Sequence, residues 1–397
     1  MKKIILPIFI ILIVTILCTY LLLHKNSNTT NNQITEKTKI NAKDTIEFDS
    51  TTYLYDIISI ENGTIISKNK RIDTSTIKSQ DITIKYKNEK NKTKQYKFTI
   101  EVKDTTSPIT FINETYSITK SDNIDLCKKI LFMDNYDKNP SCEITGEYDT
   151  NTVGEYNITI ILTDKFNNVN STDFTLKVKP ESNQSYIPTP YNLKDLINDH
   201  KSNNTMIGVD VSSWQENINW EQVKNAGVEF AIIRIGFGYN KDGENVIDKT
   251  FENNLKGATE AGLKVGVYFY SYAENINEAK KQAEWVIKTL NGAHLDLPIA
   301  FDWEDWSDFK NYNYSIHDIN EVAKSFMKTI EQNGYEAMIY GSKNYLTKVW
   351  NLPEYKTWLA HYTDKTTYEK SYQIWQLSSE GIVEGINGYV DLNVLYN

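Results

Sequence analysis

Four acidic residues stand in or at the ends of short apolar segments that the sequence predicts to be β-strands. They are Asp210, Asp302, Glu304 and Asp391. Asp302 and Glu304 are two positions apart, so on an extended chain their side chains point to the same side. Two carboxyl groups held together in a partly apolar site cannot both ionise freely, and we expect one of the two pKa values to rise. The result is an acid beside an anion, the pair that glycoside hydrolysis requires.

Aromatic residues accompany these carboxylates. An Asp-x-Glu pair alone is weak evidence, because such pairs commonly lie on a protein surface. The two further strand-end acids and a set of aromatic side chains suited to stacking on sugar rings favour a carbohydrate-active site. The candidate substrate-binding residues are Trp214, Tyr268, Tyr270, Trp303, Tyr340, Trp358, Tyr362 and Trp375. For His361 we expect a hydrogen bond within a loop rather than a substrate contact.

Short apolar segments alternate with helical stretches from residue 206 to residue 397. Eight strands are expected near residues 207–211, 230–235, 265–270, 298–302, 337–340, 357–362, 372–376 and 390–395. Helices are expected over residues 220–226, 251–261, 276–290 and 316–333, with a short one near Tyr345. Near-continuous apolar strands between helices are typical of a parallel sheet covered on its outer face. We therefore predict a shortened β/α barrel of the TIM type, with its chemistry at the C-terminal ends of the strands.

Five motifs in this region carry a resemblance to a known family. They are GVDVSSWQ at residues 208–215, AGLKVGVY at 261–268, PIAFDWE at 298–304, IWQ at 374–376 and VDLN at 390–393. In this order they resemble the family 25 glycoside hydrolases, which are N-acetylmuramidase lysozymes with a shortened β/α barrel. The one departure is Trp303, where the family usually has an aliphatic residue.

The resemblance implies an enzyme and a substrate. Such an enzyme cleaves the β-1,4 bond between N-acetylmuramic acid and N-acetylglucosamine in peptidoglycan. By this resemblance Glu304 is the general acid, and Asp302 positions or polarises the substrate's acetamido group or acts on water. Asp210 and Asp391 complete an acidic floor. No cofactor is implied.

Two alternative functions remain open at this point. The first is a chitinase-like or endo-N-acetylglucosaminidase activity, because such enzymes also carry a strand-borne Asp-x-Glu pair and cleave after N-acetylglucosamine. The second is a non-catalytic cell-wall-binding protein that keeps the barrel as a glycan lectin. The complete set of four acids speaks against this second reading.

Residues 39–106 and 107–180 are expected to form two copies of one all-β domain. Both are rich in Thr, Ile and Val with period-2 alternation, and they match each other at an offset of 76 residues, as in Phe98-Thr99 and Phe174-Thr175. The second copy resembles bacterial immunoglobulin-like domains. Cys127 and Cys142 both lie in it, and the sequence leaves open whether they are bridged. We expect both copies to be spacers.

The N-terminal segment predicts a membrane location. Residues 4–23 contain no charge and follow Lys2 and Lys3, and 20 helical residues at about 1.5 Å each span a bilayer core. We expect residues 1–25 to be a retained transmembrane anchor, residues 26–38 a tether and residues 181–205 a linker before the catalytic barrel at 206–397. The domains then lie outside the cell, and they are secreted if the segment is cleaved.

Composition excludes several classes of protein. The 397 residues are 40% hydrophobic and 24% charged, which fits a folded chain of more than one domain. The net charge of −9 and the presence of only two arginines, Arg71 and Arg234, argue against a nucleic-acid partner. Three cysteines and five histidines show no zinc-type spacing, so no metal is expected.

Overall fold

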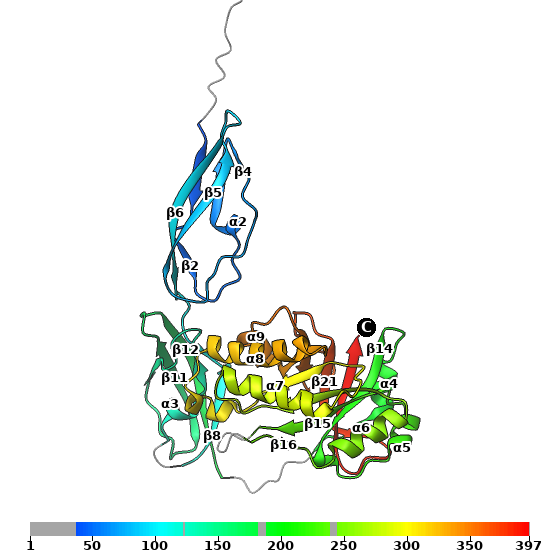
Figure 1. The fold of residues 1–397 in the computed structure, drawn as a ribbon. Helices are drawn as coiled ribbons and strands as arrows, with labels where there is room; N and C mark the ends of the chain where they lie inside the picture. Colours follow the sequence, from blue (N-terminus) through cyan, green and yellow to red (C-terminus); the bar gives the residue numbers. More distant parts are fainter. Residues whose placement is uncertain (1–36, 122–123, 182–187, 239–243, 397) are drawn as a thin grey trace, which may run out of the picture. The chain divides into compact units, whose positions relative to one another are not determined.

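The computed structural model describes residues 37–121, 124–181, 188–238 and 244–396. The chain divides into two compact units, Met1–Lys103 and Asp104–Asn397 (Figure 1). The transmembrane anchor expected at residues 1–25 lies outside the described residues. Among the residues that are described, no helix is long and apolar enough to cross a membrane.

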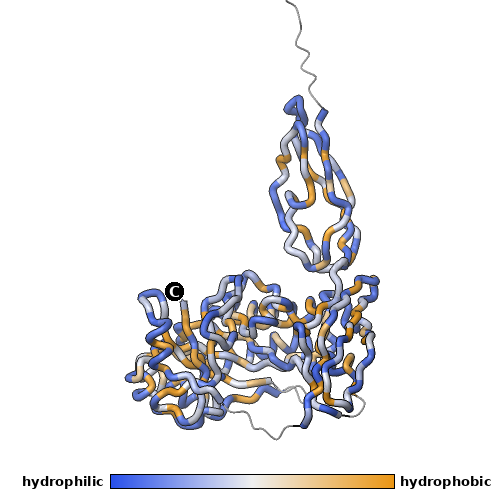
Figure 2. Tube along the Cα trace, turned by 180° about the vertical axis from the view of Figure 1, so that it is seen from behind, coloured by the Kyte–Doolittle hydropathy of each residue, from blue (hydrophilic) through white to orange (hydrophobic). Residues whose placement is uncertain are grey.

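The first unit is a small β domain with two sheets. Its four-stranded sheet has the order β2-β6-β5-β4, and β1 pairs with β3. Its elements are β1 (Lys39–Ala42), β2 (Thr45–Glu47), α2 (Leu54–Ile57), β3 (Ile58–Glu61), β4 (Thr64–Ile65), β5 (Ser79–Lys87) and β6 (Thr93–Lys103). Alternate residues of the long strands are buried, among them Ile82 and Ile84 on β5 and Ile100 and Val102 on β6. Figure 2 shows such hydrophobic positions recurring along the strands.

The second β domain repeats this arrangement at the start of the second unit. The order β10-β11-β12-β8 corresponds to β4-β5-β6-β2, and β7 pairs with β9. The elements are β7 (Ile109–Thr110), β8 (Thr115–Thr119), α3 (Leu126–Lys129), β9 (Phe132–Met133), β10 (Ser141–Thr145), β11 (Gly154–Thr163) and β12 (Val169–Lys179). In both copies the first strand of the larger sheet runs parallel to its neighbour. Cys127 and Cys142 are joined by a disulfide, with Cα atoms 5.9 Å apart.

The second β domain packs directly against the barrel, whereas the sequence had predicted a linker that separates them. Lys310 Nζ donates to the carbonyl oxygen of Cys127 at 2.7 Å, and Lys348 Nζ donates to that of Thr110 at 2.9 Å. The rings of Phe111 and Tyr345 lie 5.0 Å apart. These contacts make the second copy part of the catalytic unit.

The expected linker at residues 181–205 also differs from the structure in its second half. Residues Tyr191–Asn192 form β13, which pairs with β21 (Ile374–Ile382), and Leu193–His200 form the helix α4. Leu193 and Leu196 of α4 are buried in the core. The prediction of a linker rested on the Asn- and Ser-rich composition of this segment. It overlooked the helical spacing of two apolar residues, which lie three positions apart.

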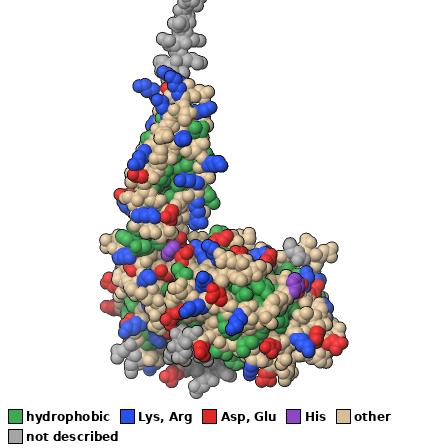
Figure 3. Space-filling view, viewed as in Figure 1, with side chains coloured by type: hydrophobic (Ala, Val, Ile, Leu, Met, Phe, Trp, Pro, Cys, Tyr) green, Lys and Arg blue, Asp and Glu red, His purple; other side chains and the backbone are tan. Residues whose placement is uncertain are grey.

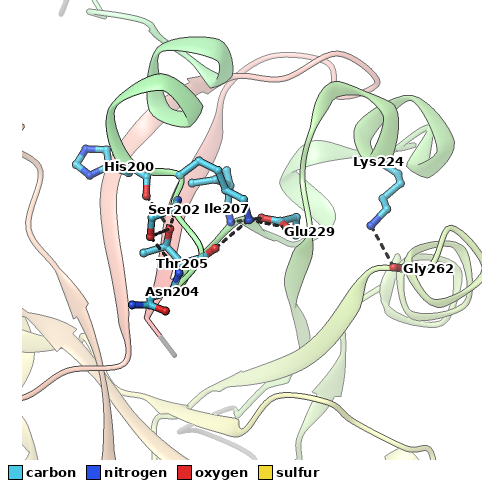
Figure 4. A network of polar contacts seen from close by, with 9 residues as sticks. His200, Ser202, Asn204, Thr205, Ile207, Lys224, Glu229 and Gly262 are labelled. Carbon is cyan, nitrogen blue, oxygen red and sulfur yellow. Dashed lines mark hydrogen bonds and ion pairs between the residues drawn. The ribbon is translucent and has the colours of Figure 1, made fainter.

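A polar network fixes the end of α4 to the barrel (Figure 4). Thr205 Oγ1 donates to the carbonyl oxygen of His200 at 2.7 Å, and Ser202 N donates to Thr205 Oγ1 at 2.8 Å. Glu229 accepts from the backbone N–H of Ile207 at 3.0 Å and forms an ion pair with Lys201 at 2.6 Å. The chain therefore enters the first barrel strand in a fixed position.

The larger sheet of the second unit closes into a barrel. Its order is β13-β21-β20-β19-β18-β17-β15-β14-β22, and an additional pairing of β21 with β22 completes the ring. The barrel strands are β14 (Thr205–Val211), β15 (Phe230–Phe237), β17 (Lys264–Tyr270), β18 (Ile299–Asp302), β19 (Ala337–Ser342), β20 (Lys356–Ala360), β21 and β22 (Val390–Tyr396). The short β16 (Val246–Ile247) pairs with the end of β15. Each predicted strand is present within two residues of its expected bounds, except that β21 ends six residues later than predicted.

Helices cover the outside of the barrel and follow its strands in turn (Figure 1). They are α5 (Trp220–Ala226), α6 (Phe251–Glu260), α7 (Ile276–Leu290), α8 (Ile316–Gln332) and α9 (Lys343–Lys348), with the 3-10 segments η1 (Ser213–Gln215) and η2 (Trp306–Tyr312). Among the described residues no helix stands between β20 and β21 or between β21 and β22. The barrel is therefore shortened, as the sequence predicted.

The last strand corrects one prediction. We expected a parallel sheet throughout, but β22 runs antiparallel to both β14 and β21. Only residues 383–389 separate β21 from β22. A parallel connection needs a crossover of about a dozen residues or more, so this short loop forces a hairpin.

Charge on the surface is mixed. On the face drawn in Figure 3, acidic and basic side chains are interspersed over the second unit. Exposed ion pairs of the second unit include Lys280 with Glu284 and Lys356 with Glu336. This face carries no broad basic patch of the kind that binds a phosphate backbone.

Candidate active site

Alternation along the strands places one set of side chains inside the barrel. The lower part of the interior is an apolar cluster of Phe230, Ile232, Ala300, Met338, Tyr340, Trp358, Ala360, Ile374 and Leu395. Gly208 contributes to it by leaving room, because a Cβ there would lie 2.3 Å from the ring of Phe230. Two residues further along, Ile232, Ala300 and Ile374 are followed by Arg234, Asp302 and Gln376. The sequence therefore turns polar on the inward face at the C-terminal ends of the strands.

These polar ends form the floor of an open cleft with a volume of about 310 Å³. All four predicted carboxylates, Asp210, Asp302, Glu304 and Asp391, line it. Asp391 is the second residue of the antiparallel strand β22. It reaches the cleft because β22 begins at the end of the barrel where the parallel strands end. Asp391 and Asp210 are direct partners in the β14–β22 pairing.

Asp210 lies at the bottom of the cleft and is held by two amides. Its Oδ2 accepts from Gln376 Nε2 at 2.9 Å and from Asn393 Nδ2 at 2.7 Å. Burial raises its pKa to about 6, although both amide hydrogen bonds favour the ionised form. The amide of Asn393 is itself oriented by Trp358, whose Nε1 donates to Asn393 Oδ1 at 2.8 Å.

Asp302 and Glu304 project into the same cleft, as their spacing predicted. Asp302 is buried, and its Oδ1 accepts no hydrogen bond from the described residues. Burial raises its pKa well above the ordinary value, the charges of Glu304 and Asp210 add to the rise, and Arg234 opposes it. Removal of water by the cleft walls raises the pKa of Glu304 to about 7, with a further rise from Asp210. Glu304 nevertheless remains open to solvent.

The electrostatics differ in one respect from the expectation. The sequence predicted that one pKa of the Asp302–Glu304 pair would rise, but burial raises both. Burial also raises the pKa of Asp391 to about 9, with the Asp210 charge as the second cause. Four carboxyls in one low-dielectric cleft cannot all be charged, so the cleft retains protons at neutral pH.

Six of the eight predicted aromatic residues line the cleft. They are Trp214, Tyr268, Tyr270, Tyr340, Trp358 and Tyr362. Trp214 is 81% exposed and Tyr362 is 57% exposed, so their rings are accessible to a ligand. The hydroxyls of Tyr340 and Tyr362 both donate to Gln376 Oε1, at 2.9 and 3.0 Å. This arrangement fixes the amide of Gln376 with its nitrogen toward Asp210.

Trp303 and Trp375 correct the predicted substrate-binding set, because neither lines the cleft. Trp375 stands between the inward-facing Ile374 and Gln376 of β21, and Trp303 stands between Asp302, the last residue of β18, and Glu304. Both tryptophans therefore point away from the cleft. Trp303 is 1% exposed and packs against Trp306, with ring centroids 4.7 Å apart. Trp375 is 3% exposed and donates from Nε1 to the carbonyl oxygen of His361 at 2.9 Å. Both are core residues.

A second hollow of about 390 Å³ adjoins the cleft at Glu304, Tyr340 and Tyr362. His361 lines it, and its Nδ1 lies 2.9 Å from Thr366 Oγ1, which is the loop hydrogen bond expected for it. Glu304 therefore stands between two connected hollows. A polymer that occupies both would pass directly over this carboxyl group.

Three polar residues of the site were missed by the sequence reasoning. Gln376 and Asn393 orient Asp210. Alternate residues of a strand point to the same side, so Gln376 is expected to point inward like Ile374, and Asn393 like Asp391. Arg234 forms an ion pair with Asp248 at 2.8 Å and donates to Ser213 Oγ at 3.1 Å, which ties β15 to the segment that carries Trp214. The sequence did contain a signal for Arg234, because a charged residue within the otherwise apolar strand β15 indicates a functional or paired position.

The fold and the cleft together define a class of protein. A β/α barrel with carboxylates from several strand ends in an aromatic-lined cleft is suited to hydrolysis of a carbohydrate. Comparison with known proteins agrees with this class. Residues 209–386 match the model of glycosyl hydrolases family 25.

Relatives of known sequence or structure are similar to about half of the chain. The uncharacterized protein YegX of Escherichia coli K12 is 32% identical over 197 residues, which cover 48% of this chain and 69% of YegX. The autolytic lysozyme of Clostridium acetobutylicum is 30% identical over 191 residues, or 47% of this chain and 55% of that protein. A family 25 glycosyl hydrolase structure from Bacillus anthracis is 23% identical with a TM-score of 0.43, and covers 50% of this chain and 92% of its own. The chain belongs to glycosyl hydrolases family 25 and is a glycoside hydrolase.

Proposed function

We propose that this glycoside hydrolase is a lysozyme that cleaves the β-1,4 bond between N-acetylmuramic acid and N-acetylglucosamine in peptidoglycan. The observation that carries the proposal is the position of Glu304 between two connected hollows, with a pKa raised to about 7. The similarity to an autolytic lysozyme supports peptidoglycan as the substrate. Oxygen-rich sugar rings also suit a cleft walled by exposed Trp214 and Tyr362.

Glu304 acts as the general acid in this proposal. With a pKa near 7 it retains a proton near neutrality and gives that proton to the glycosidic oxygen as the bond breaks. Its exposure to solvent allows the chain of sugars to reach it. A carboxyl of ordinary pKa, near 4.3, would have lost its proton at the same pH.

Asp302 acts on the substrate's acetamido group. Its Oδ1 is buried at the cleft and accepts no hydrogen bond from the described part of the chain, so it is free to accept the acetamido N–H. Arg234 favours the charged form of Asp302. Asp210, with a pKa of about 6, is ionised at neutral pH and supplies negative potential beneath the reacting sugar, where positive charge develops. Asp391, with a pKa of about 9, keeps its proton there.

The bond that is cleaved is tested by analysis of the products. Purified cell wall is digested with the full chain, and mass spectrometry identifies the sugar at each new reducing end. N-acetylmuramic acid at that end supports the proposal. N-acetylglucosamine at the new reducing end would contradict the proposal and indicate an endo-N-acetylglucosaminidase. Absence of any new reducing end, with binding to the wall retained, would favour the lectin reading.

We further propose that the enzyme works outside the cell on a membrane anchor formed by residues 4–23. Their uncharged, apolar sequence after Lys2 and Lys3 supports this orientation. The first β domain would be an immunoglobulin-like spacer between the membrane and the catalytic unit, and the second, also immunoglobulin-like, would be part of that unit. Protease added to intact cells is expected to degrade the barrel, and full protection of the barrel would contradict the orientation.

A further inference from the structure

Three aspartates that play no part in the cleft meet at one end of the second β domain. Asp104 precedes β7, Asp134 follows β9 and Asp164 follows β11. They are 5%, 1% and 4% exposed. Each offers a carboxylate oxygen, and the three oxygens all lie within 4.8 Å of one another. Three buried acids at this separation must either retain protons or bind a cation.

Protein groups satisfy only part of this cluster. The Oδ1 atoms of Asp104 and Asp134 accept backbone N–H groups of their own turns, from Thr106 at 3.2 Å and from Tyr136 at 2.9 Å. The Oδ2 atoms of Asp104 and Asp134 are buried and accept no hydrogen bond from the described residues. Two buried carboxylate oxygens without donors point to a missing partner.

No cation of the protein supplies this partner among the described residues. None of their ion pairs includes Asp104, Asp134 or Asp164. Carboxylates this close together repel one another when ionised, and their burial excludes the water that would screen them.

We propose that Asp104, Asp134 and Asp164 form a calcium-binding site. Ca²⁺ takes oxygen ligands at about 2.3–2.6 Å, so two oxygens on opposite sides of one ion are about 4.6–5.2 Å apart. The observed limit of 4.8 Å is compatible with this span. Mg²⁺ favours sites that leave several of its waters in place, and Zn²⁺ favours nitrogen and sulfur, so a buried set of carboxylate oxygens suits Ca²⁺ best.

The sequence had predicted no metal, because that prediction rested on the spacing of cysteine and histidine. Asp104, Asp134 and Asp164 are 30 residues apart in each case, and they belong to separate loops. Such ligands are adjacent only after the β domain has folded. No motif of contiguous residues predicts the site.

The loop that carries Asp134 also contacts the catalytic barrel. The carbonyl oxygens of Asp134 and Asn135 accept from the backbone N–H groups of Ile316 and His317, at 2.8 and 3.2 Å. These residues form the first turn of α8, where N–H groups lack partners within the helix. Lys138 of the same loop forms an ion pair with Asp318 at 3.2 Å. A calcium ion would therefore stabilise the barrel as well as the β domain.

The test measures calcium binding and its effect on thermal unfolding. The full chain, kept in mild detergent, is stripped with EDTA and titrated with CaCl₂ by calorimetry. We expect saturable binding of one ion, and a Tm that rises with CaCl₂ concentration because the ion binds the folded state alone. Equal concentrations of MgCl₂ are expected to raise the Tm less.

Variants locate the ion. Asp104→Asn and Asp134→Asn keep an oxygen for the turn hydrogen bonds but remove one charge each, and we expect each to weaken calcium binding at least about tenfold. Asp173→Asn is the matched control, because Asp173 is an exposed residue of β12 in the same domain. It is expected to bind calcium as the wild type does.

Three results would overturn the inference. They are no saturable calcium binding by the wild-type chain, tighter binding of Mg²⁺ or Zn²⁺ than of Ca²⁺, and unchanged calcium binding by folded Asp104→Asn and Asp134→Asn chains. The first two need no variant, so misfolding of a variant leaves the inference testable. The readouts are independent of lytic activity and therefore of the proposed function.

Discussion

The substitution Glu304→Gln tests the assignment of the general acid most directly. Glutamine has nearly the same shape as glutamic acid but has no proton to donate at any accessible pH. Since Glu304 is exposed and no hydrogen bond to its side chain holds it in the described structure, the replacement should leave the fold intact. A positioned general acid typically contributes about 10²- to 10⁴-fold to the rate. We expect kcat/KM to fall by a factor in that range.

The pKa of Glu304 predicts how the wild-type rate depends on pH. With a pKa of about 7, the side chain is roughly 90% protonated at pH 6, about half at pH 7 and roughly 10% at pH 8. The acid must carry its proton to act, so kcat/KM is expected to fall roughly tenfold between pH 6 and pH 8. The residual activity of Glu304→Gln should lack this decline.

The assay is release of reducing sugar from purified peptidoglycan by the full chain in detergent, measured from pH 5 to pH 9. Glu252→Gln on the exposed side of α6 is the matched control and should retain wild-type kinetics. Thermal unfolding confirms that each variant is folded. A folded Glu304→Gln chain that keeps more than about a third of wild-type kcat/KM would refute the assignment, given the loss expected for a general acid. If kcat/KM of this variant still declined between pH 6 and pH 8 as in the wild type, the decline would not come from the pKa of Glu304.

Three further predictions concern other residues of the cleft. Asp302→Asn is expected to lower kcat/KM at least about 100-fold, because an amide presents one acceptor oxygen and carries no charge; activity within tenfold of wild type would contradict the role proposed for Asp302. Trp214→Ala should raise KM about threefold to tenfold with little change in kcat or Tm, since the ring is 81% exposed and can lose only ligand contacts; an unchanged KM would remove Trp214 from the binding surface. Raised folded-state pKa values stabilise the protein while the groups are protonated, so the Tm should decline as pH rises toward about 9, the pKa of Asp391. Asp391→Asn should weaken that decline and raise the Tm at pH 8 relative to wild type; calorimetry that finds the same slope in both chains would contradict this account.

Much of the barrel could be predicted because local sequence and tertiary packing agree there. The helices α5 and α7 begin and end at the expected residues, since each has an Asn cap followed by an amphipathic stretch. Asp302 is the last residue of β18, and continuation of its alternation over the next two residues placed Asp302 and Glu304 on one side and Trp303 on the other. The same rule, applied strictly to Trp303 and Trp375, would have removed both from the predicted binding set.

Other features depended on chain segments that meet only in the fold. The direction of β22 follows from a short loop, and it decides that Asp391 pairs with Asp210. The amide pair Gln376 and Asn393 reaches Asp210 from strands 166 and 183 residues away in sequence. No local pattern announces such contacts, because they are created by closure of the barrel.

The sequence by itself determined the strand and helix periods, the duplication of the β domain and the parity of the Asp302–Glu304 pair. These properties depend on residues within a few positions of one another, or on a repeat that is visible in the chain. Only the tertiary structure decided that the second β domain packs on the barrel, that burial raises several carboxyl pKa values together, and that Asp104, Asp134 and Asp164 converge. The physical reason is that desolvation and charge repulsion act between neighbours in space, and those neighbours come from distant parts of the chain.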